Sequence, residues 1–146
     1  MSASNAFETA ILQLLFENAN FANVGDATGL RGSSTAGSLY ISLHTSDPGE
    51  AGDQTTNEIS YTTYARVAVA RSTAGWTVTN DTVVNDSAVT FPVCTAGSGT
   101  ATHFGFGTAS SGAGVLLLSG ALTANLAISA GITPSFAAGA LTATCA

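Results

Sequence analysis

The sequence predicts a mainly β protein, an antiparallel β-sandwich or jelly roll preceded by one short N-terminal α-helix and a Gly/Ser-rich connector. The first residues repeat apolar side chains at helical spacing, and a stretch rich in glycine and serine follows. The rest alternates short β-branched runs with Gly, Ser and Asn turns. We therefore expect a helix-and-connector arm over 1–37 and a β-sandwich domain over 38–146.

The first segment, Asn5–Asn18, is expected to form the helix. Its apolar side chains fall at i, i+4, i+7 and i+8 and would share one face; they are Phe7, Ile11, Leu14 and Leu15. Asn5 and Glu8, three residues apart, are typical of a capping box at a helix start. An apolar face on so short a helix has to be covered. Two alternatives stay open: docking as an arm on a neighbouring subunit, or folding back on its own sandwich.

The connector, Asn20–Gly37, is rich in Asn, Gly, Ser and Thr, which favour turns over regular structure. After it the pattern changes to period two: alternate residues of Leu39–His44 point to opposite sides, as in a half-buried strand. Asp47, Pro48 and Gly49 form a tight turn. Further strands are expected at Ile59–Arg71, Gly75–Thr79, Ala88–Val93, Ala101–Phe106, Val115–Leu118 and Leu141–Cys145.

Charge is scarce. Charged residues are 8% of the chain, lysine is absent, and the net charge is −6. Nucleic-acid binding is disfavoured, because neutralising phosphates needs clustered Lys and Arg. Disorder is disfavoured by a hydrophobic content of 45%. A surface so poor in charge is expected to be covered largely by partner proteins.

No run is long enough to span a membrane; the longest uninterrupted apolar stretch is Val115–Leu118. The N-terminal segment has no basic region and carries Glu8 and Glu17, so we do not expect a secretory signal. Synthesis in a cytoplasm favours free, buried thiols at Cys94 and Cys145 over a disulfide.

No catalytic, cofactor or metal site is expected. His44, Cys94, His103 and Cys145 are isolated in sequence, whereas structural zinc ligands come in close pairs. There is no GxSxG nucleophile motif, and Asp47 near His44 is expected to cap a turn rather than orient an imidazole.

Glycine and the aromatic residues indicate packing rather than chemistry. The Gly105–Gly107 segment lacks the features of a phosphate loop and indicates a β-bulge or a close backbone approach. The aromatic side chains in the expected strands are assigned to the core; they are Trp76, Phe91, Phe104 and Phe106.

Arg66 and Arg71 lie in an expected strand, where an arginine either pairs with a neighbouring carboxylate or reaches a partner chain; both alternatives remain open. The candidate partner-binding residues are therefore Phe7, Ile11, Leu14, Leu15, Arg66 and Arg71.

Several segments in a set order carry a family resemblance. They are Leu39–Gly49 (LYISLHTSDPG), Asn57–Ser60 (NEIS), Tyr64–Val69 (YARVAV), Ala101–Gly105 (ATHFG), Leu116–Leu122 (LLLSGAL) and Phe136–Leu141 (FAAGAL). Together they resemble a family of small tailed-phage virion proteins. Members are often labelled tail-fibre proteins, and others are similar to the jelly-roll cement proteins that decorate capsids, such as that of Bordetella phage. The resemblance implies no catalytic residues.

The resulting expectation is a non-enzymatic virion structural protein. It would bind the outer surface of the major capsid protein lattice as a cement protein and stabilise the shell through many repeated contacts. It would act as a homo-oligomer, a dimer or trimer, with no nucleic-acid or membrane partner. The alternative is a tail or tail-fibre component. A small enzyme or carbohydrate-binding module has little support, since the carboxylates lie mostly in turns or beside the helix.

Overall fold

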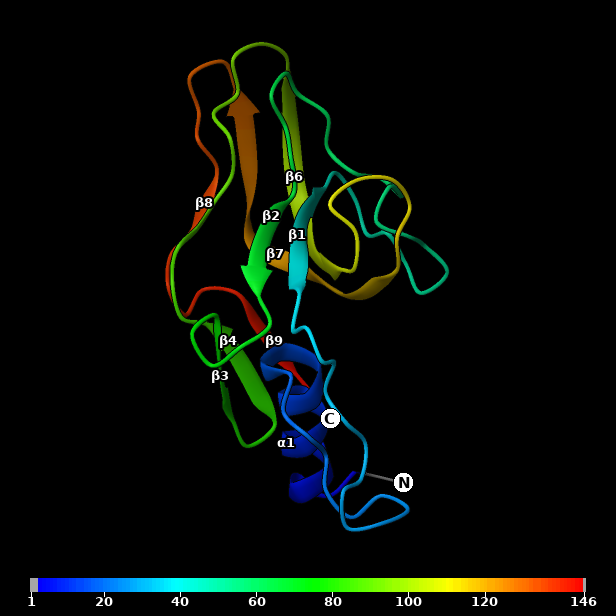
Figure 1. Cartoon of the computed structure of the whole chain (residues 1–146). Coiled ribbons are helices and arrows are strands. Elements are labelled where there is room, and N and C mark those ends of the chain that lie inside the picture. The colour runs from blue at the N-terminus through cyan, green and yellow to red at the C-terminus, as the bar shows by residue number, and fades with distance from the viewer. Residues whose placement is uncertain (1–2, 146) are drawn as a thin grey trace. The chain divides into compact units, whose positions relative to one another are not determined.

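The computed structural model describes residues 3–145, which form two compact units (Figure 1). The helix unit comprises Met1–Ser38, Ala70–Ala88 and Phe136–Ala146, and the sheet unit comprises Leu39–Val69 and Val89–Ser135. The helix unit holds α1 (Asn5–Leu12), a π-helical turn η1 (Gln13–Glu17), β3 (Trp76–Thr79), β4 (Thr82–Asn85) and β9 (Thr142–Thr144). The sheet unit is built on β1 (Ser38–His44), β2 (Val67–Ala70), β5 (Val89–Thr90), β6 (Ser98–Gly107), β7 (Leu116–Ser129) and β8 (Ser135–Phe136).

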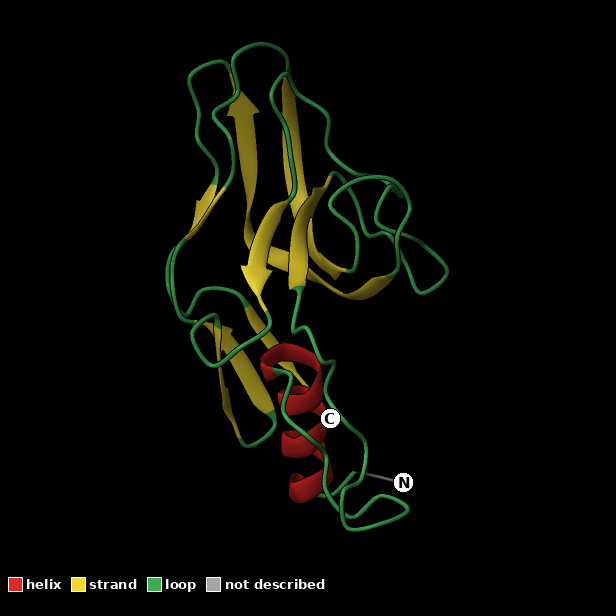
Figure 2. Ribbon diagram, in the orientation of Figure 1, coloured by secondary structure: helices red, strands yellow, loops and turns green. Residues whose placement is uncertain are grey.

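The fold class is confirmed: the protein is mainly β, with antiparallel sheets and one short N-terminal helix, consistent with a β-sandwich (Figure 2). One sheet has the strand order β2-β1-β6-β7, a second has the order β3-β4-β9, and β5 pairs with β8. Neither helical segment of the described chain is long and apolar enough to cross a membrane.

The helix starts one residue earlier than the expected capping box. Ser4 is the N-cap, and its hydroxyl accepts a hydrogen bond from the backbone N–H of Phe7 (3.4 Å). The predicted capping box was wrong, because Asn5 is already the first helical residue. Glu8 therefore lies one position further into the helix than a capping box requires, and it is buried.

The buried face of the helix also differs from the expected one. Leu12 and Phe16 are the buried apolar side chains, whereas Phe7 is 46% exposed. The other three members of the expected stripe are half-buried; they are Ile11, Leu14 and Leu15. Two causes act together. Gln13–Glu17 winds as a π-helix, which changes the angular spacing of its side chains. The partner surface is Trp76, whose ring lies edge-on to Phe16 with centroids 4.9 Å apart.

In this structure the helix packs on other segments of its own chain. Residues 1–38 belong to one compact unit with 70–88 and 136–146, segments that the sequence placed in the sandwich domain. Thr9 donates its hydroxyl proton to the carbonyl of Asn80 (2.7 Å), and Glu17 accepts from the N–H of Val78 (3.1 Å).

Strand β4, absent from the expected strands, is the centre of the small sheet. It pairs with β3 across the Asn80–Asp81 turn and with β9 on its other side. Asn85 at its end is buried, and its amide group donates to the carbonyls of Ser87 (2.7 Å) and Ala137 (2.9 Å). Its Oδ1 accepts from the N–H of Leu141 (2.8 Å), so one side chain holds the C-terminal segment in place.

Strands β6 and β7 form the longest pairing of the sheet unit. The expected four-residue strand at Val115–Leu118 is the start of β7, which continues to Ser129. The register runs from Ser98↔Ser129 to Ala101↔Leu126 and resumes at His103↔Ala121, so residues 122–125 bulge out opposite one residue of β6. By contrast, the expected strand at 59–71 is a strand only over Val67–Ala70, because a turn closed by the N–H of Tyr64 and the carbonyl of Tyr61 (3.0 Å) interrupts it.

Arg71 ties the end of the helix to the connector. Its guanidinium donates to the carbonyls of Leu15 (2.7 Å), Leu14 (2.8 Å) and Ala36 (3.0 Å). The last carbonyls of a helix lack partners within the helix and carry partial negative charge, so a cation is the preferred donor there. Arg71 thus stabilises the point where the helix ends.

We expect Arg71→Met to lower the free energy of unfolding by about 2–4 kcal/mol, because three backbone carbonyls lose a charged donor. Arg31→Met at an exposed position is the matched control and should change stability by less than about 0.5 kcal/mol. Urea unfolding followed by tryptophan fluorescence measures both, since Trp76 lies in this unit. Equal effects of the two variants would contradict the assigned role of Arg71.

Candidate functional site

A buried ion pair organises the loops of the sheet unit. Arg66 Nε and Nη2 donate to the two carboxylate oxygens of Glu58, each at 2.7 Å. The Arg66 side chain is 2% exposed and that of Glu58 16%. This bidentate geometry is the strongest arrangement of an arginine with a carboxylate, and it raises the pKa of Arg66 above its ordinary value.

The same guanidinium holds a loop that leads into β7. Arg66 Nη1 donates to the carbonyl of Ala109 (2.9 Å), and Nη2 donates to that of Gly112 (2.8 Å). Gln54 makes two further bonds to this loop: its N–H donates to the carbonyl of Ala113 (2.9 Å), and its Oε1 accepts from the N–H of Ala109 (2.9 Å). Gly107 is required here, because a Cβ on it would lie 1.9 Å from the Gln54 side chain. Residues 53–58 and 108–115 are therefore held together.

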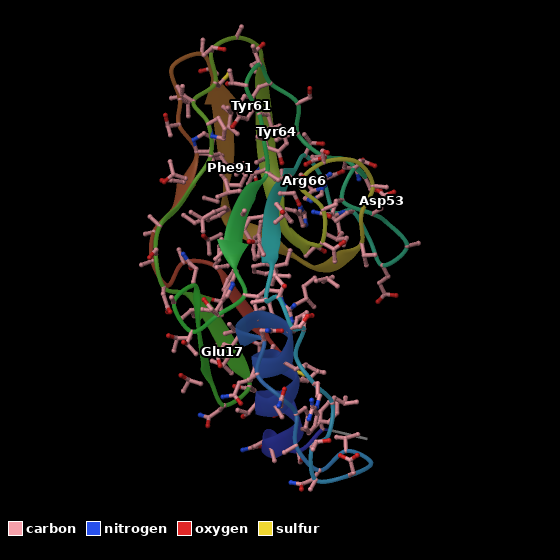
Figure 3. All side chains as sticks on the ribbon, in the orientation of Figure 1. Glu17, Asp53, Tyr61, Tyr64, Arg66 and Phe91 are labelled. Carbon is pink, nitrogen blue, oxygen red and sulfur yellow. The ribbon has the colours of Figure 1, made fainter. Side chains whose placement is uncertain are left out.

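Tyr64 completes the cluster from the core side (Figure 3). Its hydroxyl donates to Glu58 Oε1 (2.9 Å) and accepts from the N–H of Leu43 (3.0 Å). Burial, as the main cause, raises the pKa of Tyr64 far above its ordinary value, so the hydroxyl stays protonated and keeps donating. Its ring stacks on Phe91 (centroids 6.2 Å apart) and lies edge-on to Tyr61 (5.3 Å).

A second polar group, His44, is buried in β1. Its Nε2 is 2.8 Å from the hydroxyl of Ser42, and its Nδ1 is 2.8 Å from the carbonyl of Thr56. Because a carbonyl can only accept, Nδ1 carries the proton and Nε2 accepts from Ser42. Both side chains are 0% exposed, so a substrate has no route to this Ser–His pair in this conformation. Gly105 packs against them: a Cβ there would lie 2.9 Å from both polar groups, which confirms the expected close backbone approach.

The remaining candidates for chemistry are dispersed. Cys94 is buried, as expected, whereas Cys145 is half-buried, and both are free thiols. Asp47 caps its own turn, as expected, by accepting from the N–H of Gly49 (2.9 Å). Among residues 3–145, no group of three or more His, Cys, Asp or Glu side chains is placed to hold a metal ion.

A pocket of about 400 Å³ opens beside β7, and we call it the β7 pocket. One wall is the turn that carries Asp47, Gly49, Glu50 and Gly52, and the other is residues 116–119. Successive side chains of a strand point to opposite faces, so a pocket lined by four consecutive residues lies along the strand's edge. The turn wall is acidic and the β7 wall is apolar. The bonds of Arg66 and Gln54 described above hold residues 53–58, which follow the turn, against residues 108–115, which precede β7.

Sequence reasoning missed this site, although one signal was present. All charged residues lie in residues 1–86, and the rest of the chain contains none. Val115–Leu118 was predicted as a strand and found too short to span a membrane, but its exposure was not considered; in the structure Val115 is 57% and Leu118 38% exposed. An exposed apolar run in a charge-free half is typical of a surface that binds another protein.

Three of the six expected partner-binding residues meet within the helix unit, where Arg71 donates to the backbone carbonyls of Leu15 and Leu14. Arg66 lies in the sheet unit with its guanidinium bonded to Glu58 and to backbone carbonyls. Arg71 lies in the helix unit and is bonded to the carbonyls named above. Phe7 is exposed and its ring lies edge-on to that of Phe21 (centroids 5.7 Å apart).

Comparison with known proteins identifies a family. A family model described as "Podophage GP4 fiber I protein gp80" matches residues 2–144. No curated protein matches the chain.

We expect the free energy of unfolding to fall as the pH is lowered below about 6.5, because of His44. Burial, as the largest cause, lowers the pKa of His44 below 6.5; its bond to the Thr56 carbonyl and the charge of Glu58 oppose this, while Arg66 and His103 add to it. The unfolded chain therefore binds the proton first, and stability is lost between pH 6.5 and the lowered pKa, by at most about 1.4 kcal/mol per pH unit. Urea unfolding across this range measures the slope. His44→Gln should abolish it and His103→Gln should keep it; a slope unchanged by His44→Gln would refute the assignment.

The ion pair gives a second prediction. Arg66→Met should lower the free energy of unfolding by about 3–5 kcal/mol, since it leaves the Glu58 carboxylate without its partner. Adding Glu58→Leu should recover part of this loss, because the unpaired charge is then gone. A double-mutant cycle by chemical unfolding measures the coupling, and strictly additive losses would show that the two charges do not depend on each other.

Proposed function

We propose that this chain, which belongs to the family described as podophage GP4 fiber I protein gp80 and is therefore a phage virion structural protein, is a non-enzymatic component of a virion fibre. The family match over residues 2–144 carries the proposal, because it spans nearly the whole chain and its description names a fibre protein. The role of such a protein is to make repeated contacts between subunits.

The chemistry of the described residues supports a role in contact rather than catalysis. The strongest charge pair, Arg66 and Glu58, is used to hold loops, and His44 is bonded within the core. The open surface beside β7 is apolar on one wall and acidic on the other, which suits a protein segment better than a reacting small molecule.

Capsid cement remains the second candidate. A net charge of −6 suits an exterior position, because the inner face of a shell opposes DNA phosphates and favours Lys and Arg. In that role the chain would bind the major capsid protein lattice on its outer surface, as a homo-oligomer. The fibre is preferred because the family description names it.

Copy number per particle tests the choice. Quantitative mass spectrometry of purified virions, with the major capsid protein as internal standard, is the measurement. A fibre component is expected at a few copies to a few dozen, set by the symmetry of the tail. A ratio to the capsid protein near one, or a simple fraction of it, would instead make the chain a cement protein. Absence from particles would contradict both roles.

A further inference from the structure

The β7 pocket combines three properties that together select a ligand. Its acidic wall carries Asp47 and Glu50, both exposed. Its apolar wall is formed by Leu116–Leu118. Its third property is free backbone: β7 is the end strand of its sheet and, among the described residues, pairs only with β6, so the N–H and C=O groups that point away from β6 between Leu116 and Ala121 are available, with a bulge at Leu117 where the register shifts. The fitting occupant is an extended segment that carries an aliphatic and a cationic side chain next to each other.

This chain contains such a segment. The connector hairpin is closed by the pair Phe21 and Leu30, which exchange backbone hydrogen bonds of 2.8 and 2.9 Å. Gly32 and Ser33 donate their N–H groups to the side chains of Asn20 (3.1 Å) and Asn18 (2.7 Å). Asn18 also donates its side-chain N–H to the carbonyl of Ser33 (2.9 Å), so Leu30, Gly32 and Ser33 are all held by hydrogen bonds.

Arg31 differs from these neighbours. Within residues 3–145 neither its backbone N–H and carbonyl nor its guanidinium has a hydrogen-bond partner, and the side chain is exposed. Leu30 beside it is 45% exposed. The other two cations of the chain, Arg66 and Arg71, are bonded inside their units. Arg31 is thus the cation that the chain can offer to an acidic pocket.

We propose that the Leu30–Arg31 segment of one copy binds in the β7 pocket of a second copy. Arg31 would pair with Glu50 and Asp47, Leu30 would cover Leu118, and the free backbone of the segment would add to the edge of β7. Each copy contributes one segment and one pocket, so the contact closes a reciprocal dimer or ring, or continues as a filament. The inference rests on the proposed function, as it supplies the contact between subunits that a fibre component needs.

Charge exchange tests the contact with the full-length chain. Sedimentation velocity over a range of concentrations should show self-association of the wild type. Arg31→Glu and Glu50→Arg should each weaken it by about tenfold or more, since either change places like charges together. The double variant Arg31→Glu/Glu50→Arg should restore it, and so should an equimolar mixture of the two single variants, because each supplies the charge that the other lost. Both substituted positions, Arg31 and Glu50, are exposed, and circular dichroism should show unchanged folding.

The other outcomes overturn the proposal. A wild type that stays monomeric at every concentration removes the contact and leaves the fibre role intact if the chain is found in particles. Rescue by the double variant without rescue by the mixture would show that the segment binds the pocket of its own chain. Single variants that self-associate normally, while Glu50→Arg chains are lost from virions, would assign the pocket to a different virion protein.

Discussion

The arrangement of the sheet unit depends on keeping one ion pair buried. Removing a guanidinium and a carboxylate from water costs several kcal/mol each, and the cost is offset when their donors and acceptors find partners. Arg66 makes four hydrogen bonds, two to Glu58 and one to each of two loop carbonyls, and Tyr64 supplies a further donor to the carboxylate. Those bonds can form only when residues 53–58 and 108–115 lie together. The position of the β7 pocket therefore follows from the hydrogen bonds that the buried Arg66 guanidinium requires.

In the helix unit, too, an arginine satisfies polar groups that would otherwise lack partners. Arg71 donates to carbonyls at the end of the helix and to the connector, so it replaces the hydrogen bonds that a helix end lacks. A planar group with five donors suits this task better than a lysine, and the chain contains no lysine. The scarcity of cations then has a consequence for the surface. With Arg66 and Arg71 used inside, the exposed charge is acidic apart from Arg31.

Local patterns predicted what depends on neighbours in sequence. The alternation in Leu39–His44 predicted β1, and the composition of the connector predicted its lack of regular strands. The predicted buried face of the helix was wrong, because the side that is buried depends on Trp76, which is distant in sequence and contacts Phe16. The expected strand over 59–71 was too long for the same reason, since the pairing of Glu58 with Arg66 overrides β propensity. No local signal shows that β7 lies at an edge, because that depends on the order of all four strands.

An exposed strand edge is a hazard for a protein present in many copies, because any other edge can pair with it. Common protections are lysine, proline and a bulge; β7 has no lysine or proline, and besides a one-residue bulge at Leu117 it has the larger bulge at residues 122–125. The stretch before the bulge lies instead beside Asp47 and Glu50. In a chain of net charge −6, an acidic turn beside the edge repels most approaches by another copy and admits a segment with a cation. The same feature therefore prevents unspecific pairing and selects one partner segment, which is the combination that ordered assembly from identical subunits requires.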